Sequence, residues 1–233
     1  MNIVITGASK GFGKSFAEKF ASNGHHLYLC SRNEVNLYKT MEELTTKFPA
    51  VTIKAKPFDL SQKQGAKDFG NWILSLGIKV DVLINNAGQF IPGSVYNEGD
   101  DALEKMLAVN LNSAYHLTRT LLPAMMQQKS GHIFNICSIA SLDAYPNGGA
   151  YSISKFAMLG FSRNLRYEMM PHGIKVTAVC PGAAMTDSWE GFDNSQHRIM
   201  EAGDISDMVY ASTQLSKQAV VEDIILRPQL GDL

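Results

Sequence analysis

Short apolar runs alternate with amphipathic segments from one end of the chain to the other. The runs have the length and β-branched content of buried strands, and the segments between them place apolar residues at helical spacing. The predicted strands are Asn2–Thr6, His26–Cys30, Val51–Phe58, Val80–Asn85, Gly131–Cys137, Ile174–Val179 and Asp223–Leu226. The predicted helices cover residues 12–23, 33–47, 63–76, 101–128, 151–170 and 206–216. This alternation predicts a doubly wound α/β fold, with a seven-stranded, mostly parallel sheet and helices on both faces.

The chain has 233 residues, a length that doubly wound α/β folds commonly use for one domain, and it contains no linker, repeat or low-complexity tract. We therefore predict a single domain over residues 1–233. Three prolines mark expected boundaries inside it. Pro123 is expected to kink the helix at 101–128, Pro171 to end the helix at 151–170, and Pro181 to end the sixth strand.

Composition narrows the class of protein. Hydrophobic residues make up 45%, charged residues 18% and the formal net charge is −1, so neither a nucleic acid nor an anionic membrane is an expected partner. No basic-plus-apolar leader precedes the first strand, and no apolar stretch reaches the roughly 18 residues that span a bilayer, so a cytoplasmic location is expected. Cys30, Cys137 and Cys180 each close an apolar run without a Cys-x-x-Cys motif, which indicates buried thiols. The six histidines lack metal-ligand spacing, so no metal site is expected.

A glycine-rich loop follows the first predicted strand directly. Gly7, Gly11 and Gly13 lie between that strand and the first predicted helix. Glycines in this context let the backbone turn tightly and approach a pyrophosphate, whose charge is met by the amides of the helix N-terminus. The loop therefore predicts a dinucleotide site.

A tyrosine and a lysine lie four residues apart in a predicted helix. Tyr151 and Lys155 share one helix face, and Ser138 precedes Tyr151 by thirteen residues at the tip of the fifth predicted strand. A free tyrosine has a pKa of about 10, and a neighbouring ammonium favours the ionised phenol. The pair therefore predicts an acid that exchanges a proton with a substrate oxygen, which the Ser138 hydroxyl would hold in place.

These residues and several others occur in an order that resembles the short-chain dehydrogenase/reductase family along nearly the whole chain. The motifs are Thr6-Gly7-x-x-x-Gly11-x-Gly13, Asp59-Leu60, Asn85-Asn86-Ala87-Gly88, Asn110, Ser138, Tyr151-x-x-x-Lys155 and Pro181-Gly182. The resemblance implies a Rossmann-type sheet in the order 3-2-1-4-5-6-7, with NAD(P) across the carboxyl ends of the strands. It also implies a catalytic tetrad of Asn110, Ser138, Tyr151 and Lys155.

The resemblance further implies roles for the residues around the cofactor. Lys155 would also bind the nicotinamide ribose, and Asn110 would lie at a local helix kink where a water links Lys155 to solvent. Asp59 would accept from the adenine amino group, residues 86–88 would line the adenosine ribose, and Thr186 would contact the carboxamide. The expected cofactor site comprises Gly7, Ser9, Lys10, Gly11, Phe12, Gly13, Ser31, Arg32, Asp59, Leu60, Asn86, Ala87, Gly88, Tyr151, Lys155, Pro181, Gly182 and Thr186.

The end of the second predicted strand indicates which cofactor is preferred. NAD-binding proteins that this chain resembles usually carry a carboxylate there, which would repel a 2′-phosphate. This chain has Ser31 and Arg32 instead, and Lys10 in the glycine-rich loop adds a second cation. Because a guanidinium can bind a phosphate in bidentate fashion, NADP is predicted over NAD.

Residues 183–205 have two interpretations. Met185, Trp189, Phe192, Ile199 and Met200, with Gly191 and Gly203 as hinges, would form either a substrate lid or a surface loop anchored by apolar side chains. Further pocket candidates are Gln89, Tyr96 and Tyr145. The segment is short, so a compact substrate is expected. The tail at 221–228 departs from the glycine-rich ending of 3-oxoacyl-carrier-protein reductases and looks more like carbonyl, sepiapterin-type or 3-hydroxy-acid members of the family.

The predicted function is NADPH-dependent reduction of a small ketone or dicarbonyl to an alcohol, with Tyr151 as the proton donor. The alternatives are a 3-oxoacyl-carrier-protein reductase and an NADP-binding sensor or scaffold without turnover. The resemblance also implies a homodimer or homotetramer in which the helices at 101–128 and 151–170 pair across two-fold axes. The residues expected at that contact are Met106, Met125, Met126, Met158 and Phe161.

Overall fold

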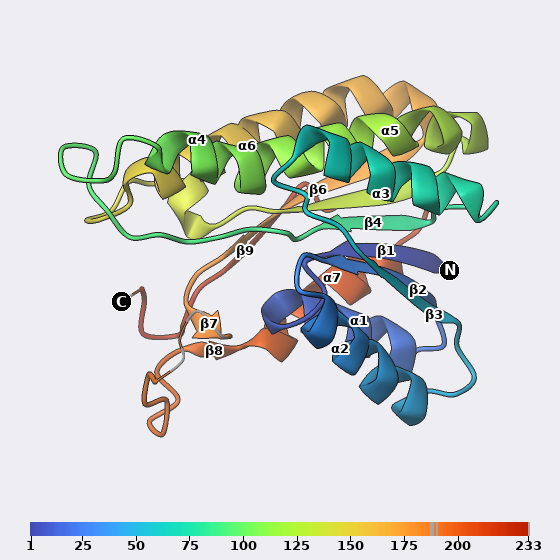
Figure 1. Cartoon of the computed structure of the whole chain (residues 1–233), viewed down its shortest axis with the longest axis horizontal. Helices are drawn as coiled ribbons and strands as arrows, with labels where there is room; N and C mark the ends of the chain where they lie inside the picture. Colours follow the sequence, from blue (N-terminus) through green and yellow to red (C-terminus); the bar gives the residue numbers. More distant parts are fainter. Residues whose placement is uncertain (187–188, 190, 233) are drawn as a thin grey trace.

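The structure is a computed structural model that describes residues 1–186, 189 and 191–232. Within these residues, seven strands form one sheet in the order β3-β2-β1-β4-β5-β6-β9, as predicted (Figure 1). The strands are β1 (Asn2–Thr6), β2 (His26–Ser31), β3 (Ile53–Pro57), β4 (Val82–Asn85), β5 (Gly131–Ile136), β6 (Ile174–Pro181) and β9 (Asp223–Leu226). All their described pairings are parallel, so their carboxyl ends lie along one edge of the sheet.

Helices cover both faces of the sheet. One face carries α1 (Gly11–Ser22), α2 (Glu34–Lys47) and α7 (Ala202–Thr213), and the other carries α3 (Lys63–Ser75), α4 (Ala102–Leu107), α5 (Ser113–Gln128) and α6 (Gly149–Met169) (Figure 1). Successive β1 side chains enter different cores, with Ile3 and Ile5 packed on the α1 side and Val4 on the α3 side. The period-2 alternation of a strand thus builds an apolar core on each face.

Several element bounds differ from the sequence prediction. β3 begins at Ile53 and β4 at Val82, because Val51 and Val80 are buried in loops outside the ladder. Both residues are apolar and β-branched, so in the sequence they look like strand residues. α7 begins at Ala202, before the predicted 206, since the Glu201 amide donates to Asp204 Oδ2 at 3.0 Å in a capping box.

The helix predicted over 101–128 is interrupted. α4 is followed by a π-helical turn, η1 (Ala108–Asn112), and then by α5, which continues through Pro123 as one helix. The break in regular α-helix therefore lies at 108–112, where Asn110 sits, and α5 remains one helix on both sides of Pro123. Pro171 follows α6 in a 3₁₀ turn, η3 (Met170–His172), and Pro181 is the last residue of β6, both as predicted.

The apolar residues expected on the outer faces of these helices lie mostly inside. Met106, Met125 and Met158 are buried in the core, so assigning these three to a subunit contact was wrong. Met126 and Phe161 are partly buried and pack against the core, and their place in a subunit contact stays a prediction. The large apolar side chains that α5 and α6 do expose are Tyr115, Ile153, Phe156 and Tyr167. An inward-facing methionine and an outward-facing one look alike in a single sequence.

The segment 183–205 contains two short parallel strands that were not predicted, β7 (Ala184–Met185) and β8 (Met200–Glu201). Asn194 closes the segment on itself, because its side chain accepts from Ile199 N at 3.0 Å and donates to Ile199 O at 3.2 Å. Ile199 is buried and Met200 packs against the core, so these two residues are anchors. Asp187, Ser188 and Glu190 of the predicted lid lie outside the described residues.

No described helix has the length and apolar character that a membrane span requires. The three cysteines, Cys30, Cys137 and Cys180, are free thiols buried in the described structure, as the sequence indicated.

Candidate active site

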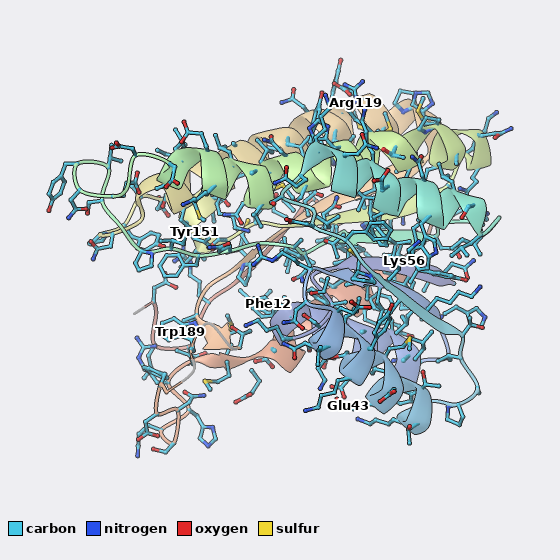
Figure 2. All side chains as sticks on the ribbon, viewed as in Figure 1. Phe12, Glu43, Lys56, Arg119, Tyr151 and Trp189 are labelled. Atoms are coloured by element: carbon cyan, nitrogen blue, oxygen red, sulfur yellow. The ribbon has the colours of Figure 1, made fainter. Side chains whose placement is uncertain are left out.

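A cavity of about 900 Å³ opens at the carboxyl edge of the sheet. Phe12 of α1 and Trp189 approach it from one side of the sheet and Tyr151 of α6 from the other (Figure 2). The predicted site residues that line it are Gly7, Ser9, Lys10, Gly11, Phe12, Ser31, Arg32, Asp59, Leu60, Asn86, Ala87, Gly88, Ser138, Tyr151, Lys155, Pro181, Gly182 and Thr186. Residues from both halves of the chain therefore meet at one site.

The glycine-rich loop is shaped by steric limits. Gly7 has φ +64° and Gly11 has φ +52°, a region that side chains disfavour. A Cβ at Gly13 would lie 2.2 Å from the carbonyl oxygen of Gly7, so Gly13 permits close packing of α1 on the loop and does not itself line the cavity. The loop thus presents backbone amides at the N-terminus of α1, an arrangement that suits a pyrophosphate.

The loop is fastened to the end of β4 by Thr6, which was not among the predicted site residues. Its hydroxyl accepts from the amides of Asn86 and Ala87, each at 2.9 Å. The Asn86 side chain donates in return to the carbonyl oxygens of Thr6 at 2.9 Å and Gly7 at 3.2 Å. The Asn86 amide group therefore holds the glycine-rich loop in place.

Two cations lie where the adenosine end of a dinucleotide would be. Lys10 and Arg32 are exposed and line the cavity, and Ser9 and Ser31 share a hydrogen bond of 2.8 Å between their hydroxyl oxygens. Farther along, Asp59 Oδ1 accepts from the backbone amide of Ser61 at 3.0 Å and from its hydroxyl at 2.7 Å. The cavity is thus cationic beside the second strand. Such a region suits the 2′-phosphate of NADP better than the free ribose hydroxyls of NAD.

Lys155 lines the cavity but is almost fully buried. Its ammonium donates to the carbonyl oxygen of Ile136, the last residue of β5, at 2.8 Å, and lies 5.8 Å from the centroid of the Tyr151 ring. Only 5% of the lysine is exposed. The positive charge is therefore fixed beside Tyr151 rather than left free in solvent.

Asn110 lies behind this pair and not on the cavity wall. Its Nδ2 donates to the Ser154 hydroxyl at 2.9 Å and to the carbonyl oxygen of Gln89 at 3.0 Å, and its Oδ1 accepts from Gln89 N at 2.7 Å. A Cβ at Gly88 would lie 3.3 Å from Asn110 Oδ1 and 3.7 Å from Lys155 Nζ. The π-helical turn thus brings Asn110 close to Lys155, with Gly88 between them.

Ser138 is held by a capping box. Its hydroxyl oxygen accepts from Ala140 N at 3.1 Å, and its own amide donates to the Ser141 hydroxyl at 3.1 Å, at the start of the 3₁₀ turn η2 (Ile139–Ser141). Since the oxygen already accepts, its proton can be donated to a ligand oxygen. Ser138 and Tyr151 consequently offer two hydroxyl donors on one cavity.

Three aromatic side chains from three different loops line the cavity near Tyr151. Phe90 meets the Tyr151 ring edge-on, with centroids 4.9 Å apart. Burial raises the pKa of Tyr145 to about 12, so this phenol is neutral at physiological pH. Trp189 also lines the cavity and packs edge-on against Phe192 at 5.2 Å. Aromatic rings therefore bound the space beside the two hydroxyls.

The C-terminal tail forms another part of this wall. Arg227, directly after β9, pairs with Asp232 and lies 3.7 Å from Asp143, and all three residues line the cavity. Arg198 donates to the carbonyl oxygens of Gly231 at 2.9 Å and Asp232 at 3.0 Å. The tail is thus folded back onto the cavity and held by two arginines.

The sequence that forms this cavity matches a known protein family. A sequence model of the family described as short chain dehydrogenase matches residues 1–197. The chain belongs to the short-chain dehydrogenase family. Its membership agrees with the fold and accounts for the order of the motifs along the chain.

Relatives and solved structures of the short-chain dehydrogenase family cover nearly the whole chain. An uncharacterized oxidoreductase of Staphylococcus epidermidis is 30% identical over 226 residues, which are 97% of this chain and 96% of the relative. A diacetyl reductase, (S)-acetoin forming, of the same species is 30% identical over 226 residues, which are 95% of this chain and 87% of the relative. The crystal structure of a metagenomic short-chain oxidoreductase in complex with NADP has a TM-score of 0.84 at 29% identity, and the match covers 98% of this chain and 97% of that one.

The cavity wall around Tyr151 in this short-chain dehydrogenase was predicted less well than the wall around the glycine-rich loop. Gln89 and Tyr145 line the cavity, but Tyr96 is 88% exposed outside it, so its assignment to the pocket was wrong. The lining residues that were missed include Phe90, Asp143, Arg227 and Asp232. The position of Arg227 just after the last strand was an available signal, because the carboxyl ends of the strands carry the site.

Proposed function

We propose that this protein reduces a small ketone or dicarbonyl to an alcohol with NADPH. The observation that carries the proposal is the convergence of Ser138, Tyr151 and Lys155 on one cavity that also holds the glycine-rich loop. A nucleotide-binding sensor has no need for two hydroxyl donors beside a buried ammonium. Turnover is therefore favoured over a sensor or scaffold role.

Binding of NADP(H) is supported by the cavity itself. The loop from Gly7 to Gly13 offers backbone amides to a pyrophosphate, and Arg32 and Lys10 offer cations to a 2′-phosphate. The metagenomic relative that binds NADP has the same fold over the same span. When bound, the dinucleotide supplies the hydride that adds to the carbonyl carbon.

The residues of the chain supply the proton and the orientation. Ser138 donates a hydrogen bond to the carbonyl oxygen and holds it near Tyr151, which transfers its phenolic proton to that oxygen as the C–O double bond becomes single. The Lys155 ammonium stabilises the negative charge left on the phenol. Asn110 orients the Gln89 backbone and Ser154 next to Lys155, and it acts through them rather than on the substrate.

A compact substrate is supported by the far end of the cavity. Phe90, Tyr145 and Trp189 bound the space beside Ser138, and the folded-back tail closes another side with Arg227 and Asp232. The diacetyl reductase of Staphylococcus epidermidis, similar over almost the whole chain, acts on such a dicarbonyl by its name. A long acyl chain would have to displace the tail or the aromatic wall.

The test is NADPH oxidation with a panel of carbonyl compounds. Diacetyl, a simple ketone and a long-chain 3-oxoacyl thioester are compared at equal concentrations, with each kcat/KM determined. We expect diacetyl or the ketone to give the highest kcat/KM. A clear preference for the long thioester would favour a 3-oxoacyl-carrier-protein reductase, and NADPH binding without turnover of any compound would favour a sensor.

A further inference from the structure

The helix that carries Tyr151 and Lys155 begins without a cap of its own. α6 starts at Gly149, and among the described residues neither Gly148 nor the first turn supplies a side-chain cap or an acid. Tyr151 is the third residue of this helix. The first amides of a helix have no partner within it, so an unsupported first turn frays readily.

A carboxylate from another segment supports this end. Glu98, in the loop between β4 and α4, accepts from Ala150 N through Oε2 at 3.0 Å. Ala150 directly precedes Tyr151 and is buried. The bond joins an ionised acceptor to a helix N-terminus, which is the favourable end for negative charge.

The backbone at the start of α6 is shaped for this contact. Gly149 has φ +34°, and a Cβ there would lie 2.4 Å from Glu98 Oε2 and 2.5 Å from the carbonyl oxygen of Gly93. A side chain at 149 would therefore exclude the carboxylate. The glycine makes room for Glu98 to reach the Ala150 amide.

The same loop is tied to the site at further points. Gly93 N donates to the carbonyl oxygen of Asn147 at 3.1 Å, and the Ser94 hydroxyl donates to Asn147 Oδ1 at 3.2 Å. Phe90 packs edge-on against the Tyr151 ring. The loop thus contacts both the backbone that leads into α6 and the ring of the proton donor.

We propose that Glu98 is a positioning residue for Tyr151. By fixing the amide of Ala150, its carboxylate holds the first turn of α6 so that the phenolic hydroxyl stays beside Ser138. The role rests on the proposed reductase function, because it is a role in that reaction. Errors of about 1 Å in the placement of a reacting group can lower a rate by about 10²-fold, and loss of a helix cap destabilises the first turn of the helix.

Three variants test the proposal. Glu98→Ala removes the acceptor, Glu98→Gln keeps an amide oxygen that can accept from Ala150, and Asp100→Ala removes an exposed carboxylate from the same loop as a control. We expect Glu98→Ala to lower kcat for the best carbonyl substrate about tenfold, with the Kd for NADPH within about twofold of the parent. Glu98→Gln should recover most of the lost kcat, and Asp100→Ala should match the parent.

Hydrogen exchange at the amides of residues 149–153 gives a readout that needs no turnover. Faster exchange at these amides in Glu98→Ala, but not in Glu98→Gln, supports the positioning role of Glu98 even if the protein reduces none of the carbonyls tried. The proposal is overturned if exchange at these amides is unchanged. It is also overturned if Glu98→Ala keeps the parental kcat well below its unfolding temperature, or if NADPH affinity falls as much as kcat.

Discussion

Lys155 Nζ donates a hydrogen bond to the carbonyl oxygen of Ile136 at 2.8 Å, which joins the second turn of α6 to the end of β5. The lysine therefore has a structural anchor in addition to its place beside Tyr151. We expect Lys155→Ala to lower kcat and also to weaken NADPH binding, because Lys155 is predicted both to favour the ionised Tyr151 phenol and to bind the nicotinamide ribose. Steady-state kinetics and a fluorescence titration with NADPH measure the two effects, and parental NADPH affinity would contradict the second assignment.

Tyr151→Phe separates chemistry from binding. The change removes the phenolic proton but keeps the ring that packs against Phe90. We expect kcat to fall by a factor on the order of 10² to 10⁴ while the Kd for NADPH changes little. Near-parental turnover would mean that another group is the acid.

Arg32→Asp tests the choice of cofactor. It deletes the proposed phosphate partner and places a carboxylate beside the second strand, so preference should move from NADPH towards NADH. We expect KM for NADPH to rise by about 10- to 100-fold, the range for loss of charged hydrogen bonds. Lys10→Ala should weaken NADPH by less. Equal use of both cofactors by the parent protein would refute the argument before any mutation.

His132 should make the protein less stable in weak acid. Burial lowers the pKa of His132 from 6.5 to about 3, and its Nε2 lies 2.7 Å from the Thr177 hydroxyl, which itself donates to Val221 O. The unfolded chain takes up a proton below pH 6.5 while the folded one does not until about pH 3, so stability falls as pH decreases between these values. The contribution of this one histidine is up to about 1.4 kcal/mol per pH unit.

Urea denaturation at pH 7.5, 6 and 5 measures this effect. His132→Gln should show a shallower decrease in the free energy of unfolding with falling pH than the parent. His197→Asn is a suitable control, because His197 is exposed and asparagine tolerates its φ of +49°. The same slope in His132→Gln and the parent would show that other groups dominate the acid sensitivity.

Self-association is expected through the outer faces of α5 and α6. Tyr115, Ile153, Phe156 and Tyr167 are exposed on these helices. Arg119 of α5, which points outward from the helix layer in Figure 2, donates to the Tyr115 hydroxyl at 2.8 Å. We predict twice or four times the chain mass by light scattering at micromolar concentration. Phe156→Glu should lower that mass, whereas Val35→Glu on α2, on the opposite face, should not. A monomeric parent would rule the contact out.

The sequence was sufficient for the order of the strands in the sheet and for most of the residues that line the cavity around the glycine-rich loop, because both depend on local patterns. The alternation along a strand, the glycines of the loop and the pair Tyr151 and Lys155 are all short-range patterns. Over such short separations, distance along the chain determines distance in space. The contacts of Thr6 with Asn86 and Ala87 were missed because they join residues eighty positions apart. A threonine hydroxyl at a strand end gives no sign of which loop it will bind.

The substrate end could not be predicted from spacing, because it is assembled from loops and a tail. Tyr96 and Phe90 are both aromatic residues of one loop, yet Tyr96 is 88% exposed, whereas Phe90, although 45% exposed, packs against the Tyr151 ring. Their difference depends on how the loop bends around Gly93 and Glu98, whose packing involves the start of α6. Arg227 likewise reaches the cavity only because the tail turns back and is held by Asp232 and Asp143.

The parallel pairing of the seven strands separates two kinds of surface. Each of the seven strands ends at the cavity edge of the sheet and begins at the opposite edge. A parallel strand rises about 3.3 Å per residue, so its length separates the two edges. Turns at that opposite edge, such as those containing Gly24 and Gly77, have open space around them. Labels or immobilisation chemistry attached in these turns, at positions other than Gly24 and Gly77 with their positive φ, would leave the cavity edge unchanged. Selection for new substrates would act on the cavity edge without altering the sheet or its two cores.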